Sequence, residues 1–267
     1  MRGRSVLASC SSWTFIGISL RPTLLCTAQQ CQPAVFSPAH NACASCPGAA
    51  SIASIMREVA PLVRRFVEGL DAVEGNVIDL ACGSGQNGLF VAQRDQEMRR
   101  RNRRVVLLDK NIKEAARCTA DLPEATRELV VHEETDLETA ENPSPLPKEA
   151  FGAALVFNYL HRPLIPNLRD SIKPGGLVLY KTFTWEHPSI GVRPSNPAFL
   201  LGPGELKADL FAGWEVLHFF EGVEVVEDKE STGAGDGASG GGCSGRRAAV
   251  SSIVCRKPPR ATSPPKT

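Results

Sequence analysis

The order of apolar and polar positions over residues 58–257 predicts strands that alternate with helices. The runs predicted as strands are 77–80, 104–109, 129–131, 151–157, 177–183, 214–226 and 248–255. The segments predicted as helices are 60–70, 112–120, 165–171 and 206–211. In the first helix, apolar residues recur at i, i+3 and i+4, so one face should pack under the sheet. Five strands alternating with helices and a closing hairpin indicate an α/β fold with a doubly wound, mostly parallel sheet.

The same pattern predicts one domain over residues 58–257, a length that can bury a core without disulfides or metals. Inside it, residues 231–245 hold seven glycines among fifteen residues and are expected to form a flexible insertion, because they cannot bury enough apolar surface to become ordered. The tail at 258–267 is expected to be disordered.

Residues 1–57 differ in composition from the rest of the chain. They contain four arginines and no acidic residue, are rich in Ser, Ala and Cys, and show no sustained helical or strand period. This composition is typical of a targeting leader, and a mitochondrial or plastid transit peptide is the first prediction, with a secretory signal as the second. If translation starts at Met56, the protein is expected in the cytoplasm. The apolar run at 13–20 is too short to span a membrane, so no membrane anchor is predicted.

The cysteines do not form a recognisable framework. Five of the nine fall within the leader, where Cys43 and Cys46 make the spacing C-x-x-C. A single pair of this kind, without a second pair or a neighbouring histidine, is weak evidence for zinc. No metal site and no disulfide pattern are predicted.

Charge argues against nucleic acid as a partner. The net charge is +1, and the four leader arginines leave residues 58–267 with 1 − 4 = −3. The exception is an arginine cluster formed by Arg99, Arg100, Arg101, Arg103 and Arg104. It follows a predicted helix, whose dipole favours cations at its end, so a solvated helix end is the first interpretation and an RNA-binding patch the second.

The chemistry-bearing feature is the segment at 77–88, which is predicted as a buried strand, a glycine turn and a helix start. Gly83 and Gly85 let the backbone turn sharply and approach a ligand closely, and the helix start offers unpaired N–H groups. The spacing Gly83-x-Gly85-x-x-Gly88 also fits the dinucleotide fingerprint, which leaves NAD open. Asp79 within the strand would repel a pyrophosphate and suits a cationic or zwitterionic ligand better.

Asp109 ends the second predicted strand, 24 residues after Gly85. A carboxylate at this position can accept hydrogen bonds from both ribose hydroxyls, which serves NAD and S-adenosylmethionine alike. The alternative is that it caps the helix at 112–120.

The turn resembles the first motif of class I S-adenosylmethionine-dependent methyltransferases. The pattern D-L-x-C-G-x-G-x-G is matched by Asp79, Leu80, Cys82, Gly83, Gly85 and, one residue late, Gly88. The resemblance implies a Rossmann-like, seven-stranded sheet, S-adenosyl-L-methionine as cofactor, and an adenine contact from Asp136 and Leu137, which otherwise belong to an acidic solvated loop. The cofactor-binding residues that it implies are Asp79, Ala81, Cys82, Gly83, Ser84, Gly85, Asp109, Lys110, Asp136, Leu137 and Asn158.

A narrower resemblance rests on residues 151–183, with F-N-Y-L-H-R-P-L, then Pro174-Gly175-Gly176 as a turn before the fifth strand, then Y-K-T-F. These blocks resemble the tellurite-resistance-type methyltransferases. If the acceptor needs deprotonation or clamping, the candidate catalytic residues are Tyr159, His161 and Arg162. Their structural alternatives are packing against the cofactor for Tyr159, helix capping for His161 and tying down the strand end for Arg162.

Together these features predict a methyltransferase that transfers a methyl group to a small-molecule acceptor, with neither nucleic acid nor membrane as a partner. Two alternatives remain open, an NAD-linked oxidoreductase and a methyltransferase-like module that binds protein or RNA. The sequence leaves the acceptor and the oligomeric state open.

Overall fold

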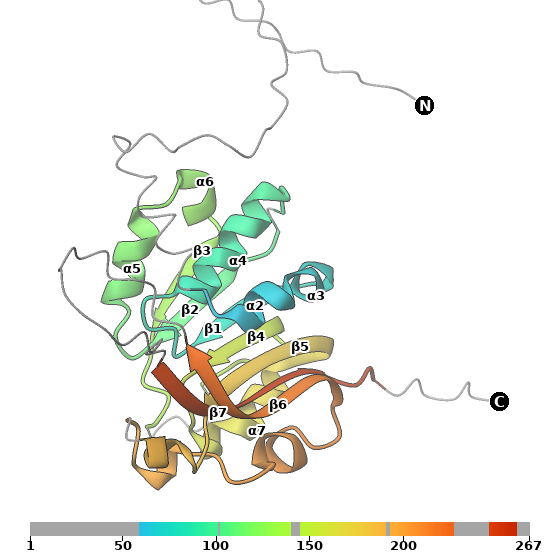
Figure 1. Ribbon diagram of the computed structural model, residues 1–267. Coiled ribbons are helices and arrows are strands. Elements are labelled where there is room, and N and C mark those ends of the chain that lie inside the picture. Colours follow the sequence, from blue (N-terminus) through green and yellow to red (C-terminus); the bar gives the residue numbers. More distant parts are fainter. Residues whose placement is uncertain (1–58, 101, 140–144, 191–192, 227–245, 261–267) are drawn as a thin grey trace, which may run out of the picture. The chain divides into compact units, whose positions relative to one another are not determined.

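The computed structural model describes residues 59–100, 102–139, 145–190, 193–226 and 246–260 (Figure 1). The predicted leader at 1–57, the C-x-x-C pair, Arg101 and the glycine-rich insertion at 231–245 lie outside the described residues, as does the end of the predicted tail. Along the described chain, no helix is long and apolar enough to cross a membrane. The same residues hold no group of three or more His, Cys, Asp or Glu side chains that could bind a metal ion.

The core of the domain is a seven-stranded sheet in the order β3-β2-β1-β4-β5-β7-β6. The strands are β1 (Asn76–Leu80), β2 (Val105–Asp109), β3 (Val130–Glu134), β4 (Phe151–Phe157), β5 (Ile172–Phe183), β6 (Glu215–Val226) and β7 (Arg246–Arg256). This sheet agrees with the seven-stranded, Rossmann-like architecture that the resemblance implies. The third strand is displaced from its prediction, so Glu133 and Glu134 lie in β3 and not in a loop.

The sheet is mixed, which corrects the prediction of a mostly parallel sheet. The first five strands in chain order pair in parallel, whereas β7 pairs antiparallel with both β5 and β6. The antiparallel pair of β6 and β7, from Glu215↔Arg256 to Val226↔Arg246, is the predicted closing hairpin. The hairpin joins the sheet through β7, which lies between β5 and β6 and runs antiparallel to both.

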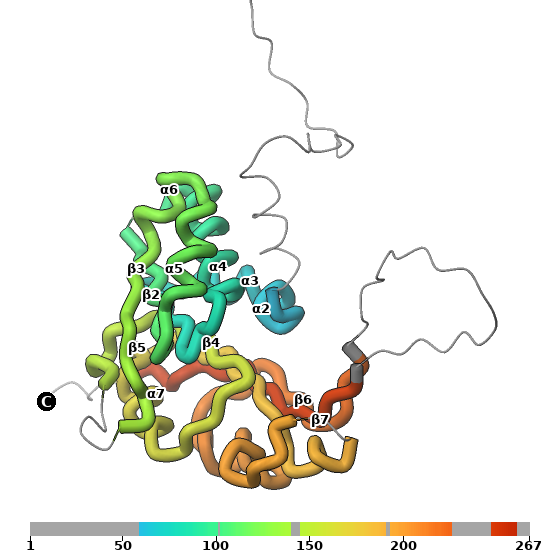
Figure 2. The backbone as a smooth tube through the Cα atoms, turned by 90° about the vertical axis from the view of Figure 1, so that its left-hand side faces the viewer, coloured from blue at the N-terminus to red at the C-terminus, as the bar shows by residue number. Residues whose placement is uncertain are grey.

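Helices cover both faces of the sheet (Figures 1 and 2). One face carries α2 (Pro61–Arg65), α3 (Val67–Ala72), α4 (Gln86–Glu97) and α5 (Lys113–Ala120), and the other carries α7 (Ile165–Ser171) and the π-helical turn η4 (Leu206–Leu210). The remaining helices are α6 (Glu124–Arg127), η1 (Arg162–Leu164), η2 (His187–Ile190) and η3 (Pro197–Phe199). Alternate residues of the central strands enter two separate apolar clusters; Ile78 and Leu80 pack on one face and Val77 on the other. This two-faced burial confirms the doubly wound arrangement.

Two local predictions differ from the structure. The single helix expected at 60–70 is two helices, because the chain leaves helical geometry at Phe66 (φ −107°, ψ 20°). The Pro174-Gly175-Gly176 block lies within β5, as an irregular stretch of the strand, and not as a turn before it. There the pairing with β4 jumps from Phe151↔Ile172 to Ala153↔Leu177, and Gly175 takes φ +79°. The glycines absorb this bulge without a steric cost that other residues would carry.

The arginine cluster is not wholly a solvated helix end. Arg103 is only 5% exposed, and its Nε lies 2.8 Å from Oδ2 of the buried Asp95 on α4. Its Nη1 also donates to the carbonyl oxygens of Leu70 (2.6 Å) and Val73 (3.1 Å). Arg103 therefore anchors the segment that connects α4 with β2.

Candidate cofactor site

The predicted glycine turn connects β1 to α4 at the carboxyl edge of the parallel strands. Ala81, Gly83 and Gly85 have φ values of +54°, +57° and +77°, and Gly85 is the N-cap of α4. A side chain at Gly85 is excluded by space as well, because a Cβ would lie 2.9 Å from Leu107 Cδ1. The turn therefore depends on glycine for its backbone conformation and for its close packing on β2.

Asp79 lies beneath this turn and does not point into open space. Its side chain is buried, and its Oδ2 accepts a hydrogen bond from the backbone N–H of Gly88 (2.8 Å). A Cβ on Gly88 would lie 2.4 Å from Leu107 Cδ2 and 3.0 Å from Asp79 Cβ. Close packing therefore requires glycine at position 88, although the family pattern places its third glycine one residue earlier. Asp79 therefore supports the turn from below through its hydrogen bond to Gly88, and its role in cofactor binding stays a prediction.

Burial raises the pKa of Asp79 from 3.8 to about 7, the Gly88 hydrogen bond opposes this rise, and the negative charge of Asp109 adds to it. The folded state thus holds this proton more tightly than the unfolded state. As pH rises from about 4 towards 8, the unfolded state gives up the proton first, so the contribution of Asp79 to stability is present at low pH and lost as pH passes through about 7.

We predict that Asp79→Asn makes the free energy of unfolding less dependent on pH. Between pH 5 and pH 8 the free energy of unfolding should decrease in the wild-type protein, and this decrease should exceed that of the variant by on the order of 1–3 kcal/mol. The amide oxygen of the variant still accepts the hydrogen bond from the N–H of Gly88. Urea unfolding at both pH values measures the difference, with Asp136→Asn, at an exposed carboxylate, as the control. Equal pH slopes in the wild-type protein and Asp79→Asn would contradict the assignment.

Asp109 joins the turn to the end of β2. Its Oδ2 accepts from the N–H of Gly83 (2.9 Å), and its Oδ1 accepts from the N–H of Asn111 (3.0 Å). The second contact is made to the segment before α5. Asp109 therefore also supports the start of this helix, as the alternative of a helix cap expected. The first contact places the carboxylate directly beside the glycine turn, where a ligand on the turn would meet it.

A cavity of about 200 Å³ opens at this point. Its lining residues come from the ends of β1, β2 and β4 and the segment after β3, and they are Ala81, Asp109, Lys110, Thr135, Asp136, Leu137, Glu138 and Tyr159. Six of these eight were predicted as site residues, five as cofactor-binding and Tyr159 as catalytic. Thr135 and Glu138 were not. Glu138 could have been found from the D-L-E motif, whereas Thr135 is brought in by its backbone N–H, which donates to Asp109 O (3.0 Å), and nothing in the sequence signals that contact.

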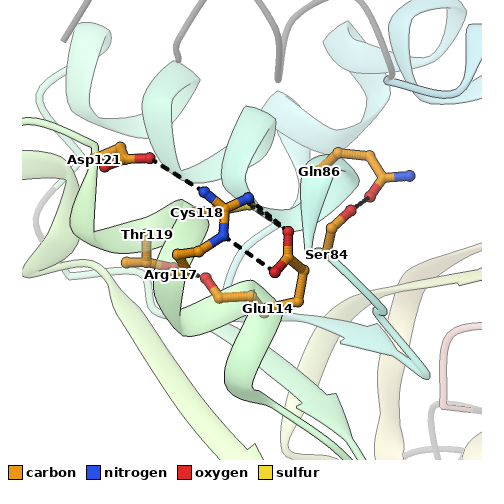
Figure 3. A network of polar contacts seen from close by, with 8 residues as sticks. Ser84, Gln86, Glu114, Arg117, Cys118, Thr119 and Asp121 are labelled. Carbon is orange, nitrogen blue, oxygen red and sulfur yellow. Dashed lines mark hydrogen bonds and ion pairs between the residues drawn. The ribbon is translucent and has the colours of Figure 1, made fainter. Parts of the chain in front are cut away.

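The turn residues Cys82 and Ser84 do not line this cavity. Cys82 is buried, and its pKa is raised first by burial and then by the charges of Asp79 and Asp109, so it stays a neutral thiol. The hydroxyl of Ser84 donates to Gln86 Oε1. Figure 3 shows this pair beside α5, where Arg117 binds Glu114 (2.6 Å) and approaches Asp121 (3.9 Å) on the same helix. Arg117 is therefore paired with carboxylates of α5 and of its C-cap.

The segment after β4 carries the candidate catalytic residues. Asn158 follows the strand with φ +56°, and its N–H donates to Lys181 O on β5 (2.8 Å). Tyr159 lines the cavity, where its hydroxyl lies beside the carboxylate of Glu138. Burial, followed by the negative charges of Glu138 and Asp136, raises the pKa of Tyr159 well above its ordinary value. A phenol held protonated in this way can donate a hydrogen bond but is a poor general base at neutral pH.

The side chain of Arg162 is hydrogen-bonded to other residues of the protein. Its Nε and Nη2 bind the carboxylate of Glu205 (2.5 and 2.8 Å), and its Nη1 and Nη2 donate to the carbonyl oxygens of Ala198 (3.0 Å) and Leu200 (2.8 Å). This bidentate pair ties η1 to the segment before η4, as the structural alternative expected, and leaves no free fork for an anionic acceptor. His161 accepts from Leu164 N–H through its backbone oxygen, while its half-buried side chain makes no cap contact.

No protein-family model matches the sequence, and no curated protein sequence matches it. Among solved structures, the chain is similar to a protein studied for the conversion of a disulfide bond into a thioacetal group during echinomycin biosynthesis. The two share 16% sequence identity, the match covers 76% of this chain and 84% of that chain, and the TM-score is 0.50. An S-adenosylmethionine-dependent methyltransferase from Methanosarcina mazei has 15% identity, coverage of 76% and 99%, and a TM-score of 0.49.

The glycopeptide N-methyltransferase MtfA, solved with S-adenosylmethionine, is similar at 17% identity, with coverage of 75% of this chain and 96% of that chain and a TM-score of 0.45. At identities this low the likeness concerns the fold alone, and the two weaker scores carry no argument. The first structure shows that the open α/β fold extends over 76% of this chain and is shared with a protein of known structure.

Proposed function

We propose that this protein is an S-adenosylmethionine-dependent methyltransferase that acts on a small-molecule acceptor. The observation that carries the proposal is the cavity of about 200 Å³ beside the glycine turn, with Asp109 at one side and Asp136 and Glu138 at another. Asp109 stands where ribose hydroxyls would donate to it, and Asp136 stands where the family resemblance expects the adenine amino group. The names of the structural neighbours agree with this proposal but do not carry it at such low similarity.

The charge of the cavity separates this cofactor from NAD. Its lining holds three carboxylates, those of Asp109, Asp136 and Glu138, against one cation, Lys110. Such a lining attracts a cationic sulfonium and an ammonium group and repels a pyrophosphate. The N–H of Gly83, which a phosphate would need, is already bonded to Asp109. These features favour S-adenosylmethionine over a dinucleotide.

The cofactor would supply an electrophilic methyl group on a positively charged sulfur. The task left for the protein is to align the acceptor with that methyl group and to keep water away, because charge disperses during an in-line displacement of this kind. Tyr159, whose hydroxyl stays protonated beside Glu138, can donate a hydrogen bond to the cofactor or the acceptor. If the acceptor must lose a proton, His161 is the remaining candidate base near the end of β4.

The narrower assignment to the tellurite-resistance-type group is also part of this proposal. It rests on the F-N-Y-L-H-R-P-L and Y-K-T-F blocks, whose residues surround the ends of β4 and β5. Methyl transfer from labelled S-adenosylmethionine to tellurite, selenite and small thiols would test it. Transfer only to a protein or RNA fraction would favour the alternative module instead.

The cofactor assignment predicts that the full-length protein binds S-adenosylmethionine and S-adenosylhomocysteine and does not bind NAD at comparable concentrations. Isothermal titration measures the three affinities. The melting temperature should rise with the concentration of S-adenosylmethionine, because a ligand that binds only the native state stabilises it. Tighter binding of NAD than of S-adenosylhomocysteine would overturn the assignment.

A further inference from the structure

A second cavity lies at the amino ends of the strands, on the edge of the sheet opposite the glycine turn. Its volume is about 930 Å³, within the range of small-molecule sites. It lies between the end of α4 and the segment around α6, next to the residues that precede β2 and β3. The lining residues are Gln96, Glu97, Arg99, Arg100, Arg104, Ala125, Glu128 and Leu129. We name it the arginine groove.

Three of these eight residues are arginines. Within the described chain, neither Arg99 nor Arg100 has a side-chain ion pair, and the side chain of Arg104 donates only to the carbonyl oxygen of Glu128. The guanidinium groups therefore keep donors available for a ligand, unlike that of Arg162. Glu97 and Glu128 are the acidic residues among the described lining residues, which together carry a net positive charge of one.

The backbone holds these arginines in place at some cost. Arg99 takes φ +58° at the end of α4, a conformation in which glycine is the usual residue. Arg100 N–H then returns to Asp95 O (2.8 Å), and the buried pair of Arg103 and Asp95 fixes the following residues. A buried ion pair stabilises a fold little but specifies one arrangement of the chain. The segment is thus anchored by Arg103 and presents its neighbours to the groove.

We propose that the arginine groove binds a small ligand that carries two or more phosphate groups in series. Arginine forks match phosphate oxygens, and a groove of about 930 Å³ beside three arginines has room for more than one phosphate group. A nucleic-acid chain fits less well. Among the described residues of the lining, none is aromatic and able to stack a base. Residues 58–267 carry a net charge of −3, so a long polyanion that extends beyond the groove would meet mostly negative surface. The proposal is independent of the methyltransferase assignment, because it concerns the opposite edge of the sheet.

The test is a calorimetric titration of the full-length protein with inorganic tripolyphosphate. Arg99→Gln and Arg104→Gln should each weaken binding about tenfold or more, and the double variant by the product of the two losses. Arg127→Gln, which removes an exposed arginine of α6 that does not line the groove, is the matched control and should change binding less than twofold. Thermal melting and affinity for S-adenosylhomocysteine should be unchanged in all variants, so failure here is distinguishable from failure at the cofactor site.

Two outcomes would overturn the proposal. The first is a lack of saturable binding of tripolyphosphate, which would mean that the groove is not a site for it. An equal loss of affinity with Arg127→Gln counts as well, since it would mean that only general surface charge is involved. The second is binding of a single-stranded RNA oligonucleotide at least ten times tighter than tripolyphosphate, with the same dependence on Arg99 and Arg104, since the groove would then serve a nucleic acid. ATP in a parallel titration distinguishes a nucleotide from a free polyphosphate as the source of the phosphates.

Discussion

Replacing Asp109 with alanine is expected to weaken the binding of S-adenosylmethionine about tenfold to a hundredfold while the protein stays folded. The carboxylate stands at the end of β2 and already accepts the N–H groups of Gly83 (2.9 Å) and Asn111 (3.0 Å). A ribose held by this group would gain charge-assisted hydrogen bonds worth about 1.5–3 kcal/mol, which corresponds to that range of affinity. Isothermal titration with S-adenosylhomocysteine measures the loss.

Glu114→Gln is the matched control for this experiment. Glu114 is a nearby carboxylate on α5, but it is bound to Arg117 (2.6 Å) and does not line the cavity (Figure 3). Its replacement should leave the affinity unchanged. If Asp109→Ala lowers the melting temperature and leaves the affinity intact, then Asp109 acts only as a support for the turn and for the start of α5, and the ribose assignment fails.

Gly152→Ala is expected to lower the free energy of unfolding by at least about 2 kcal/mol. A Cβ at this position would lie 2.1 Å from the backbone oxygen of Glu74 and 2.8 Å from Val73 Cγ1. Because the nearest atom is backbone, a change of side-chain rotamer cannot relieve the contact. Gly152 is the residue at which the pairing of β4 with both neighbouring strands shifts register.

Gly69→Ala provides the contrast, since this glycine lies within α3 and its added Cβ would meet only Leu177 Cδ1, at 3.4 Å. Alanine favours a helix over glycine by about 1 kcal/mol, so this variant should be neutral or more stable. Urea unfolding compares the two variants with the wild-type protein. A Gly152→Ala protein as stable as Gly69→Ala would show that β4 can move away from the Glu74 backbone.

The sequence alone was sufficient for the seven strands and for the edge of the sheet at which the candidate cofactor site lies. Apolar runs located the buried strands β1, β2 and β4 closely, because such strands need continuous apolar stretches, whereas the exposed β3 and the start of β5 were placed less well. The glycine turn and Asp109 were found because each combines residue type with spacing. The pairing of the last two strands as a hairpin was predicted as well. Local patterns do not record, however, that β7 lies between β5 and β6 and runs antiparallel to β5.

The roles of individual polar residues depended on tertiary contacts. The sequence presented Asp79 as a ligand contact, Arg162 as a clamp and Arg103 as a solvated charge. In the fold, Asp79 is bound to Gly88 N–H, Arg162 to Glu205, and Arg103 to the buried Asp95. Each partner lies 8 to 43 residues away in the sequence, and packing selects it. Residue type and spacing thus determine which side chains reach the carboxyl edge of the sheet, whereas long-range packing decides which of them remain available to a ligand, since a buried charge must find a partner within the fold.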